Sequence, residues 1–265
     1  MASNKREREL ARMRAERQAA RRAAEIARRK QRRNGVFAAI AALAVIAVVV
    51  VVALVVGLGG DEKKTTVTTA STKYGNTGGE GSCSYTKAGT AAKKVDGTPP
   101  TSKVKTTGTQ TVTFDTTRGA IKATLLTSKA PCTVNSLVFL AQQGYFNGTS
   151  CHRLTTSGIY VLQCGDPTGS GGGGPGYQFP DENLQGATYP AGTLAMANAG
   201  AGTNGSQFFL VYKDSQLPPS YTPFGTITGG LDVLTKVAAG GSDNSSAQGD
   251  GKPKLAISLT TVTIS

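Results

Sequence analysis

Histidine is the scarcest chemically versatile residue of this 265-residue chain, because it occurs only once, as His152. No serine and acidic residue accompany it in an order or spacing typical of a catalytic triad, which argues against a hydrolase. Zinc sites combine several histidine, cysteine or carboxylate ligands, and no carboxylates cluster around His152. We therefore predict no metal site, and we expect His152 to have a structural, hydrogen-bonded role.

Two further patterns are incomplete. The glycine-rich run at 169–176 lacks the Gly-Lys-Ser/Thr ending and the following helix of a phosphate-binding loop, so it is predicted to be a flexible surface loop. The basic stretch at 5–33 has no interleaved aromatic residues and no folded nucleic-acid motif, so no nucleic-acid partner is expected. This stretch fits either a solvated tail that sets topology or contact with anionic lipids.

Negative charge is sparse at the N-terminus. Residues 1–35 hold 13 Lys and Arg but four Glu, and so supply +9 of the formal net charge of +13. The next 23 residues, 36–58, carry no charge, and they are long enough to cross a bilayer as a helix. A cleaved secretory signal is the alternative, but it has a shorter apolar run and a small-residue cleavage site such as Ala-x-Ala, which is missing here. We predict a single-pass cell-membrane protein with a cytoplasmic tail at 1–35 and an extracytoplasmic C-terminal part.

Residues 59–107 are rich in Thr, Ser, Gly and Lys and have few large apolar side chains, which predicts a flexible linker. Cys83 and Tyr85 are the exceptions, and they suggest a short segment that packs on the following domain. The chain has four cysteines, which can form one or two disulfides in an oxidising compartment, and free buried thiols are the alternative. Three full pairings exist, and the sequence does not choose among them.

From residue 108 to residue 265 the pattern changes to that of a folded domain. Short apolar and β-branched runs alternate with turn residues, and two segments have helical spacing. The pattern alone allows either a barrel or a sandwich. The predicted strands are 111–116, 120–126, 151–155, 159–164, 192–197, 207–212, 223–228 and 255–264, and the predicted helices are 131–144 and 231–239.

The stretch Met196–Phe209, MANAGAGTNGSQFF, is the most informative part of the sequence. Its small residues let a ligand approach the backbone closely. Asn198 and Gln207 supply two amides that can pair with a peptide backbone, and Phe208 and Phe209 supply rings that can receive an apolar side chain. These are the components of a peptide-binding groove.

The same stretch closely resembles the signature of the cyclophilins, the cyclophilin-type peptidyl-prolyl cis-trans isomerases. The resemblance covers about residues 109–265, and its motifs occur in the expected order. It implies a mainly β fold, an eight-stranded antiparallel closed barrel capped by two α-helices. It also implies a bacterial, membrane-anchored form of the enzyme when combined with the N-terminal pattern.

The resemblance further implies a catalytic arginine. Cys151-His152-Arg153-Leu154 is similar to the Phe-His-Arg strand of the family, in which the arginine is catalytic. A guanidinium that hydrogen-bonds the prolyl nitrogen favours the twisted, pyramidal state over either planar one, so no covalent intermediate and no cofactor are needed. The segment from Leu162 to Asp166 resembles the Gln-Gly-Gly-Asp motif, with Cys164 at the first glycine. It gives Gln163 a catalytic role beside Gln207.

The remaining site residues are also implied by the resemblance. Between Arg153 and Gln163 the chain is two residues longer than typical eukaryotic members, and alignment backward from Gln163 places Tyr160 and Val161 in the proline pocket. Gln216 replaces a common Trp, and Tyr221 replaces a common His, which affects cyclosporin binding more than catalysis. The predicted substrate-binding residues are Tyr160, Val161, Ala197, Asn198, Phe209, Leu217 and Tyr221.

The sequence thus predicts an isomerase that acts on X-Pro bonds of exported or cell-surface proteins. A peptide-binding chaperone or adaptor on the same fold, with little turnover, is the alternative. The two differ at Arg153, because peptide binding by an adaptor would survive the substitution Arg153→Ala.

Overall fold

The computed structural model describes residues 80–265, which belong to one compact unit. The predicted tail at 1–35, the predicted membrane helix at 36–58 and residues 59–79 of the predicted linker lie outside the described residues. Within 80–265, neither helix combines the length and the apolar character needed to cross a membrane.

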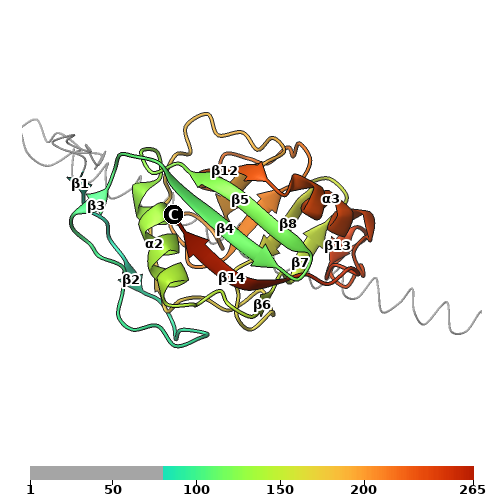
Figure 1. Ribbon diagram of the computed structural model, residues 1–265, viewed down its shortest axis with the longest axis horizontal. Coiled ribbons are helices and arrows are strands. Elements are labelled where there is room, and N and C mark those ends of the chain that lie inside the picture. Colours follow the sequence, from blue (N-terminus) through green and yellow to red (C-terminus); the bar gives the residue numbers. More distant parts are fainter. Residues whose placement is uncertain (1–79) are drawn as a thin grey trace, which may run out of the picture. The chain divides into compact units, whose positions relative to one another are not determined.

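An antiparallel sheet of ten strands forms the body of the molecule and curls into a half-barrel (Figure 1). The predicted eight-stranded closed barrel is therefore wrong in strand number and in closure. The two edge strands of the sheet, β13 and β6, are short, and between β6 and β7 the chain passes from one end of this strand order to the other. In spatial order the strands are β13 (Asp250–Gly251), β7 (Arg153–Thr155), β8 (Val161–Cys164), β11 (Phe208–Val211), β10 (Thr193–Met196), β12 (Pro223–Gly229), β5 (Gly119–Leu125), β4 (Gln110–Thr116), β14 (Ser258–Ile264) and β6 (Thr149–Ser150).

Alternation of apolar and polar residues explains strand β5. Ile121, Ala123 and Leu125 are buried, whereas Lys122 and Thr124 between them are exposed and partly buried, respectively. By contrast, all four residues of β10 and of β11 are buried, which indicates that both faces of these strands are covered. One face lies in the main core and the other under a second, smaller apolar cluster.

Helix α2 (Pro131–Gln142) packs on β14, and helix α3 (Leu231–Ala239) packs on β5 (Figure 1). Both were predicted. Helix α2 has no side-chain cap on its own N-cap residue. Instead, the carboxylate of Glu182 accepts hydrogen bonds from the backbone N–H groups of Cys132 and Thr133, at 3.0 and 2.8 Å. A carboxylate at this end satisfies open N–H groups and interacts favourably with the helix dipole.

Residues 80–107 form what we call the N-terminal strap, an ordered segment that lies against the domain. It carries β1 (Glu80–Gly81), β2 (Thr86–Lys87) and β3 (Val104–Lys105); β1 pairs with β3, and β2 pairs with β9 (Tyr177–Gln178). The prediction of a flexible linker over 59–107 is therefore wrong for residues 80–107. The strap has too few apolar residues for a core of its own, but it is ordered by contacts with the domain.

Two disulfides, Cys83–Cys132 and Cys151–Cys164, select one of the three pairings that the sequence left open. The first joins the strap to the start of α2, as the positions of Cys83 and Tyr85 suggested. The second joins Cys151, two residues before β7, to Cys164, the last residue of β8. No cysteine is free among the described residues.

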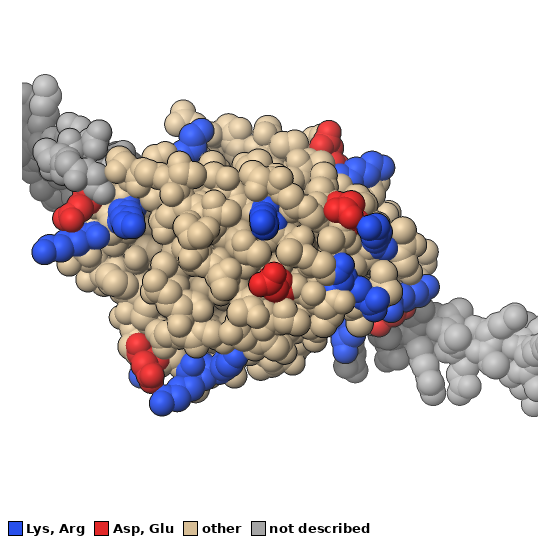
Figure 2. Space-filling model, in the orientation of Figure 1, with Lys and Arg blue, Asp and Glu red and all other residues tan. Residues whose placement is uncertain are grey.

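The surface of the domain is weakly charged. Residues 80–265 contain 13 basic and 10 acidic residues, so the strong positive charge belongs to the N-terminal part of the chain. On the face shown in Figure 2, most of the surface is uncharged, and basic and acidic side chains are scattered over it.

Candidate functional site

Three predicted site residues lie in one row across three neighbouring strands. Arg153 of β7 is the cross-strand partner of Gln163 of β8, and Gln163 is the partner of Phe209 of β11. Directly opposed residues on antiparallel strands have side chains on the same face of the sheet. Strand pairing therefore brings together a guanidinium, an amide and an aromatic ring. The first and the last of these, Arg153 and Phe209, are 56 residues apart along the chain.

A small cavity of about 130 Å³ opens beside this row. Its floor is the smaller apolar cluster, in which Val161 and Phe209 are 2% and 4% exposed and pack with the partly buried Leu217 and Tyr221. Eight of the ten predicted site residues line it. The complete lining is Arg153, Ile159, Val161, Gln163, Ala197, Asn198, Phe209, Leu217 and Tyr221.

Arg153 is held at the edge of the cavity by Asp250 of β13. Its Nε and Nη2 donate to the two carboxylate oxygens of Asp250 at 2.8 and 2.7 Å, a bidentate ion pair. The hydrogen bonds that Arg153 donates to Asp250 raise the pKa of Arg153 above its ordinary value, so the guanidinium stays charged. The side chain of Arg153 is nevertheless 40% exposed, so a ligand in the cavity can reach it. The sequence analysis missed Asp250, because 97 residues separate the two and no local motif links them.

A chain of hydrogen bonds continues from Arg153 through two amides. Nη1 of Arg153 donates to Oε1 of Gln163 at 3.4 Å, and Nε2 of Gln163 donates to Oε1 of Gln207 at 2.8 Å. Nε2 of Gln207 then donates to the carbonyl oxygens of Gly171 and Gly173, both at 2.9 Å. The three predicted catalytic residues are thus mutually connected, although Gln207 does not itself line the small cavity.

The glycine-rich run that closes this chain is organised around the fully buried carboxylate of Asp166. Asp166 accepts hydrogen bonds from the backbone N–H groups of Thr168, Gly171 and Gly173 at 2.7, 2.7 and 3.0 Å. The prediction of a flexible surface loop missed this buried acceptor, which fixes the two carbonyl groups that orient Gln207.

Tyr160 does not line the cavity, contrary to the prediction, and Ile159 lies there instead. Successive side chains of a strand point to opposite faces, so Ile159, Val161 and Gln163 share one face and Tyr160 belongs to the other. Tyr160 instead packs edge-on against Tyr212, with Nζ of Lys213 4.4 Å from its ring centre. Counting in steps of two from Gln163 would have identified Ile159 from the sequence.

The opposite rim of the cavity is built from Asn198 and Tyr221. Nδ2 of Asn198 donates to the carbonyl oxygen of Ser220 at 2.8 Å, which ties the 196–209 stretch to the loop before β12. The ring of Tyr221 packs edge-on against Phe209, with 5.6 Å between ring centres. Its backbone N–H donates to Oη of Tyr189 at 3.1 Å. The aromatic residue at position 221 therefore completes the apolar wall.

Comparison with known families agrees with this geometry. The model of the family "Cyclophilin type peptidyl-prolyl cis-trans isomerase/CLD" matches residues 111–264, more than half of the chain. The chain is a cyclophilin. The match contains all the strands of the main sheet apart from the first residue of β4, and every residue that lines the small cavity.

Similar proteins come from mycobacteria and from a eukaryotic parasite. The probable peptidyl-prolyl cis-trans isomerase B of Mycobacterium tuberculosis is 49% identical over 199 residues, and that of Mycobacterium leprae is 47% identical over 192 residues. These matches cover 68% and 67% of this chain, which spans only 63% and 64% of those relatives. The crystal structure of a cyclophilin from Cryptosporidium parvum aligns with a TM-score of 0.54 at 33% identity, covering 60% of this chain and 98% of that one.

The surroundings of His152 in this cyclophilin differ from the structural, hydrogen-bonded role that the sequence analysis predicted. Its backbone N–H donates to the carbonyl oxygen of Gln163 at 3.0 Å, but neither of its buried ring nitrogens has a hydrogen-bond partner. Burial lowers the pKa of the imidazole below its ordinary value, so the ring is neutral at pH 7. Within residues 80–265 no group of three or more His, Cys, Asp or Glu side chains is placed to hold a metal ion.

We predict that Asp250 positions Arg153 for its function. Asp250→Ala removes both acceptors of the guanidinium, and we expect kcat/KM on an X-Pro peptide to fall about 10-fold through kcat, with KM unchanged. Asp250→Asn keeps one acceptor oxygen and should restore most of the activity. Peptide isomerisation kinetics test this. Equal kcat values for wild type and Asp250→Ala would contradict the positioning role.

We also predict acid sensitivity that depends on Asp166. Burial alone would raise the pKa of Asp166, but hydrogen bonds from Thr168, Gly173 and Gly171 outweigh it and lower the pKa to about 2. Because the folded-state pKa lies below the unfolded value, the stabilisation of about 2 kcal/mol is complete above about pH 4 and is lost as the pH falls towards 2. Urea unfolding from pH 7 to pH 2 measures it.

Two variants make this pH experiment specific. Asp166→Asn should be less stable than wild type at pH 7 and should lose less stability on acidification. Asp96→Asn is the matched control, because the Asp96 side chain is 80% exposed, and its acid profile should follow that of wild type. An Asp166→Asn profile parallel to that of wild type would contradict the assignment.

Proposed function

We propose that this cyclophilin catalyses cis–trans isomerisation of X-Pro peptide bonds, with Arg153 as the catalytic residue. One observation carries the proposal: a charged, partly exposed guanidinium is anchored at the edge of a small apolar cavity. The cavity would hold the prolyl ring against Val161, Phe209 and Leu217. A solved relative from Cryptosporidium parvum was crystallised in the presence of the dipeptide Ala-Pro, which supports proline-containing ligands for this fold.

The hydrogen bonds of Arg153 leave it able to act on a substrate. A guanidinium has five N–H donors, and three of them are used by Asp250 and Gln163. One of the two that remain can donate to the prolyl nitrogen. That nitrogen accepts a hydrogen bond well only when rotation has withdrawn its lone pair from the carbonyl group, so the interaction is strongest in the transition state.

The rest of the site supports rotation without covalent chemistry. Gln163, itself hydrogen-bonded to Gln207, holds the side of the guanidinium that Asp250 does not contact. The apolar floor would hold the proline ring while the residue before it rotates about the X-Pro bond. Donors that are already oriented need no rearrangement during the reaction, so they stabilise the transition state more than water molecules would. No bond forms or breaks, and no cofactor takes part.

The test is isomerisation of a short X-Pro peptide by the purified full chain, followed by NMR exchange. We expect exchange much faster than the uncatalysed step of about 10–100 s. The alternative, a peptide-binding chaperone or adaptor, predicts that the peptide binds but that exchange stays near its uncatalysed rate. Peptide shifts on titration with the protein report binding separately from turnover, so the two functions give different results.

We further propose that residues 80–265 lie outside the cytoplasm and act on exported or cell-surface proteins. The uncharged run at 36–58 behind a basic tail supports this location, and the two disulfides fit an oxidising compartment. Protease added to intact, wall-stripped cells should then degrade the domain. Degradation only after lysis would contradict the proposed location.

A further inference from the structure

The N-terminal strap borders a second cavity of about 450 Å³ next to the small one. Ala88, Gly89 and Thr90 of the strap form part of its wall. Gln163, Ala197 and Asn198 line both cavities, so the two are neighbours within one groove. A peptide whose proline occupies the small cavity would therefore extend towards the strap.

Backbone contacts fix the strap along this wall. Beyond the pairing of β2 with β9, the N–H groups of Ala88 and Ala92 donate to the carbonyl oxygens of Gly176 and Gly174, at 2.9 and 2.8 Å. A Cβ atom on Gly176 would lie 3.0 Å from the backbone nitrogen of Ala91, so only a glycine lets the strap approach this closely. The wall is therefore held in place by the two-stranded β2–β9 sheet and by close packing.

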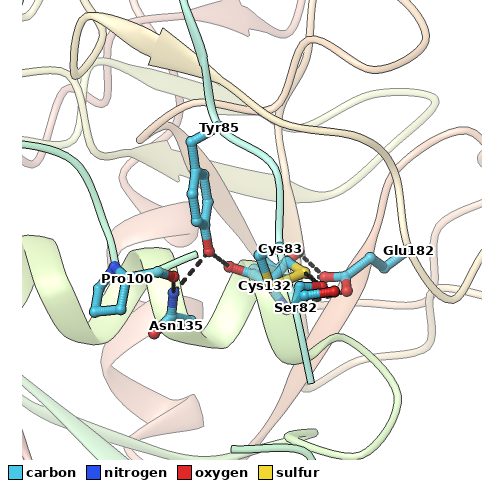
Figure 3. The surroundings of a disulfide bond; sticks show 8 residues. Ser82, Cys83, Tyr85, Pro100, Cys132, Asn135 and Glu182 are labelled. Carbon is cyan, nitrogen blue, oxygen red and sulfur yellow. Dashed lines mark hydrogen bonds between the residues drawn. A yellow bond between two sulfur atoms is a disulfide. The ribbon is translucent and has the colours of Figure 1, made fainter. Parts of the chain in front are cut away.

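A second set of contacts anchors the strap to helix α2, as Figure 3 shows around the Cys83–Cys132 disulfide. Oη of Tyr85 donates to the carbonyl oxygen of Cys132 at 2.7 Å and accepts from Nδ2 of Asn135 at 2.8 Å. The same Asn135 amide donates to the carbonyl oxygen of Pro100 at 2.9 Å. The segment carrying Ala88, Gly89 and Thr90 thus follows directly after a covalent and hydrogen-bonded attachment point.

The strap lies outside the part of the chain that matches the family model, which begins at residue 111. The wall at 88–90 is thus an addition to the common domain. The residues that line the second cavity include amides, hydroxyls and small side chains but no Lys, Arg, Asp or Glu. Such a surface offers a charged side chain no ion-pair partner, whereas an uncharged side chain needs none, so it favours an uncharged side chain.

We propose that Ala88, Gly89 and Thr90 belong to the substrate-binding surface, where they select an uncharged side chain on a residue flanking the proline. The proposal rests on the isomerase function proposed above. It predicts that wild type has a higher kcat/KM for an Ala-Pro peptide flanked by Leu than for one flanked by Lys or Glu. A peptide flanked by Gly leaves the second cavity empty and serves as the reference.

The experiment compares the full chain with two Thr→Trp variants. Thr90→Trp fills the second cavity, and we expect the Leu/Gly ratio of kcat/KM to fall about fivefold or more. Thr98→Trp is the matched control, because Thr98 is an exposed threonine of the same strap that does not line this cavity. Its Leu/Gly ratio should equal that of wild type. Circular dichroism checks folding, and Ala88→Leu replaces Thr90→Trp if that variant does not fold.

Each outcome has a distinct meaning. An unchanged ratio in the cavity-filling variant, or an equal fall in Thr98→Trp, would overturn the role of the strap. If wild type isomerises none of the peptides, the isomerase function fails instead. In that case calorimetric binding of the Leu-flanked and Gly-flanked peptides still tests the strap, since Thr90→Trp should weaken only the first.

Discussion

Replacing Arg153 by alanine is expected to lower kcat/KM on an X-Pro peptide by at least about 100-fold, the loss typical when one oriented donor is removed from an active site. The effect should appear in kcat. The ground-state amide accepts no hydrogen bond at its nitrogen, so peptide affinity should change little. Asp250 would lose its partner, but it is only partly buried, and the fold should persist.

Two further arginine variants make the test specific. Arg153→Lys keeps the charge, but the compact ammonium group lacks the planar fork that pairs with both Asp250 oxygens and points other N–H groups into the cavity, so activity should stay low. Arg118→Ala is the matched control, because Arg118 is exposed and donates through Nε to the carbonyl oxygen of Ala256, away from the cavity. Near-normal activity of Arg153→Ala would show that another group carries the reaction.

Replacing Gly165 by alanine is expected to cost about 3 kcal/mol or more of unfolding free energy, among the largest effects of a single substitution. Gly165 has φ +91°, a conformation that residues with a side chain rarely adopt. A Cβ atom there would contact the carbonyl oxygen of Ser206 and lie 3.0 Å from Cα of Gln207. The added methyl group would therefore push apart the segments that carry Gln163 and Gln207, and activity should fall too.

Gly169→Ala separates the two causes of this loss. Gly169 also has positive φ, at +66°, but no atom lies within 4 Å of the place of its Cβ. Gly169→Ala should therefore lower the free energy of unfolding only by the backbone strain, about 1–2 kcal/mol. Urea unfolding of both variants gives the comparison. Equal losses would mean that the close approach of Gly165 to Ser206 contributes nothing.

Much of the domain could be predicted from the sequence, because its signals are local. The alternation in β5, and the start of α2 at Pro131, depend on residues adjacent in the chain, and both were correctly predicted. The two-residue strands β6 and β13 are too short to leave a pattern. The strap could not be predicted as ordered, since its order comes from the domain beneath it and from the choice of Cys132 as the partner of Cys83.

The same distinction holds for the site. Motif order indicated Arg153, Gln163 and Phe209, and strand pairing places them in one row. Asp250 could not be found, because its bond to Arg153 depends on how β13 returns to β7. Tyr160 was a different error: two extra residues before Gln163 made the alignment uncertain, and the alternation of the strand was not applied to correct it.

The most direct test of the account is the exchange between the cis and trans forms of an Ala-Pro peptide, measured by two-dimensional NMR with catalytic amounts of the full chain. The account predicts cis–trans cross-peaks with wild type at a mixing time of about one second, well below the uncatalysed step of about 10–100 s. It predicts none with Arg153→Ala, while both proteins shift the peptide resonances. Cross-peaks of equal intensity with the two proteins would contradict the role of Arg153. Peptide shifts without cross-peaks in wild type would show a binding module rather than an isomerase.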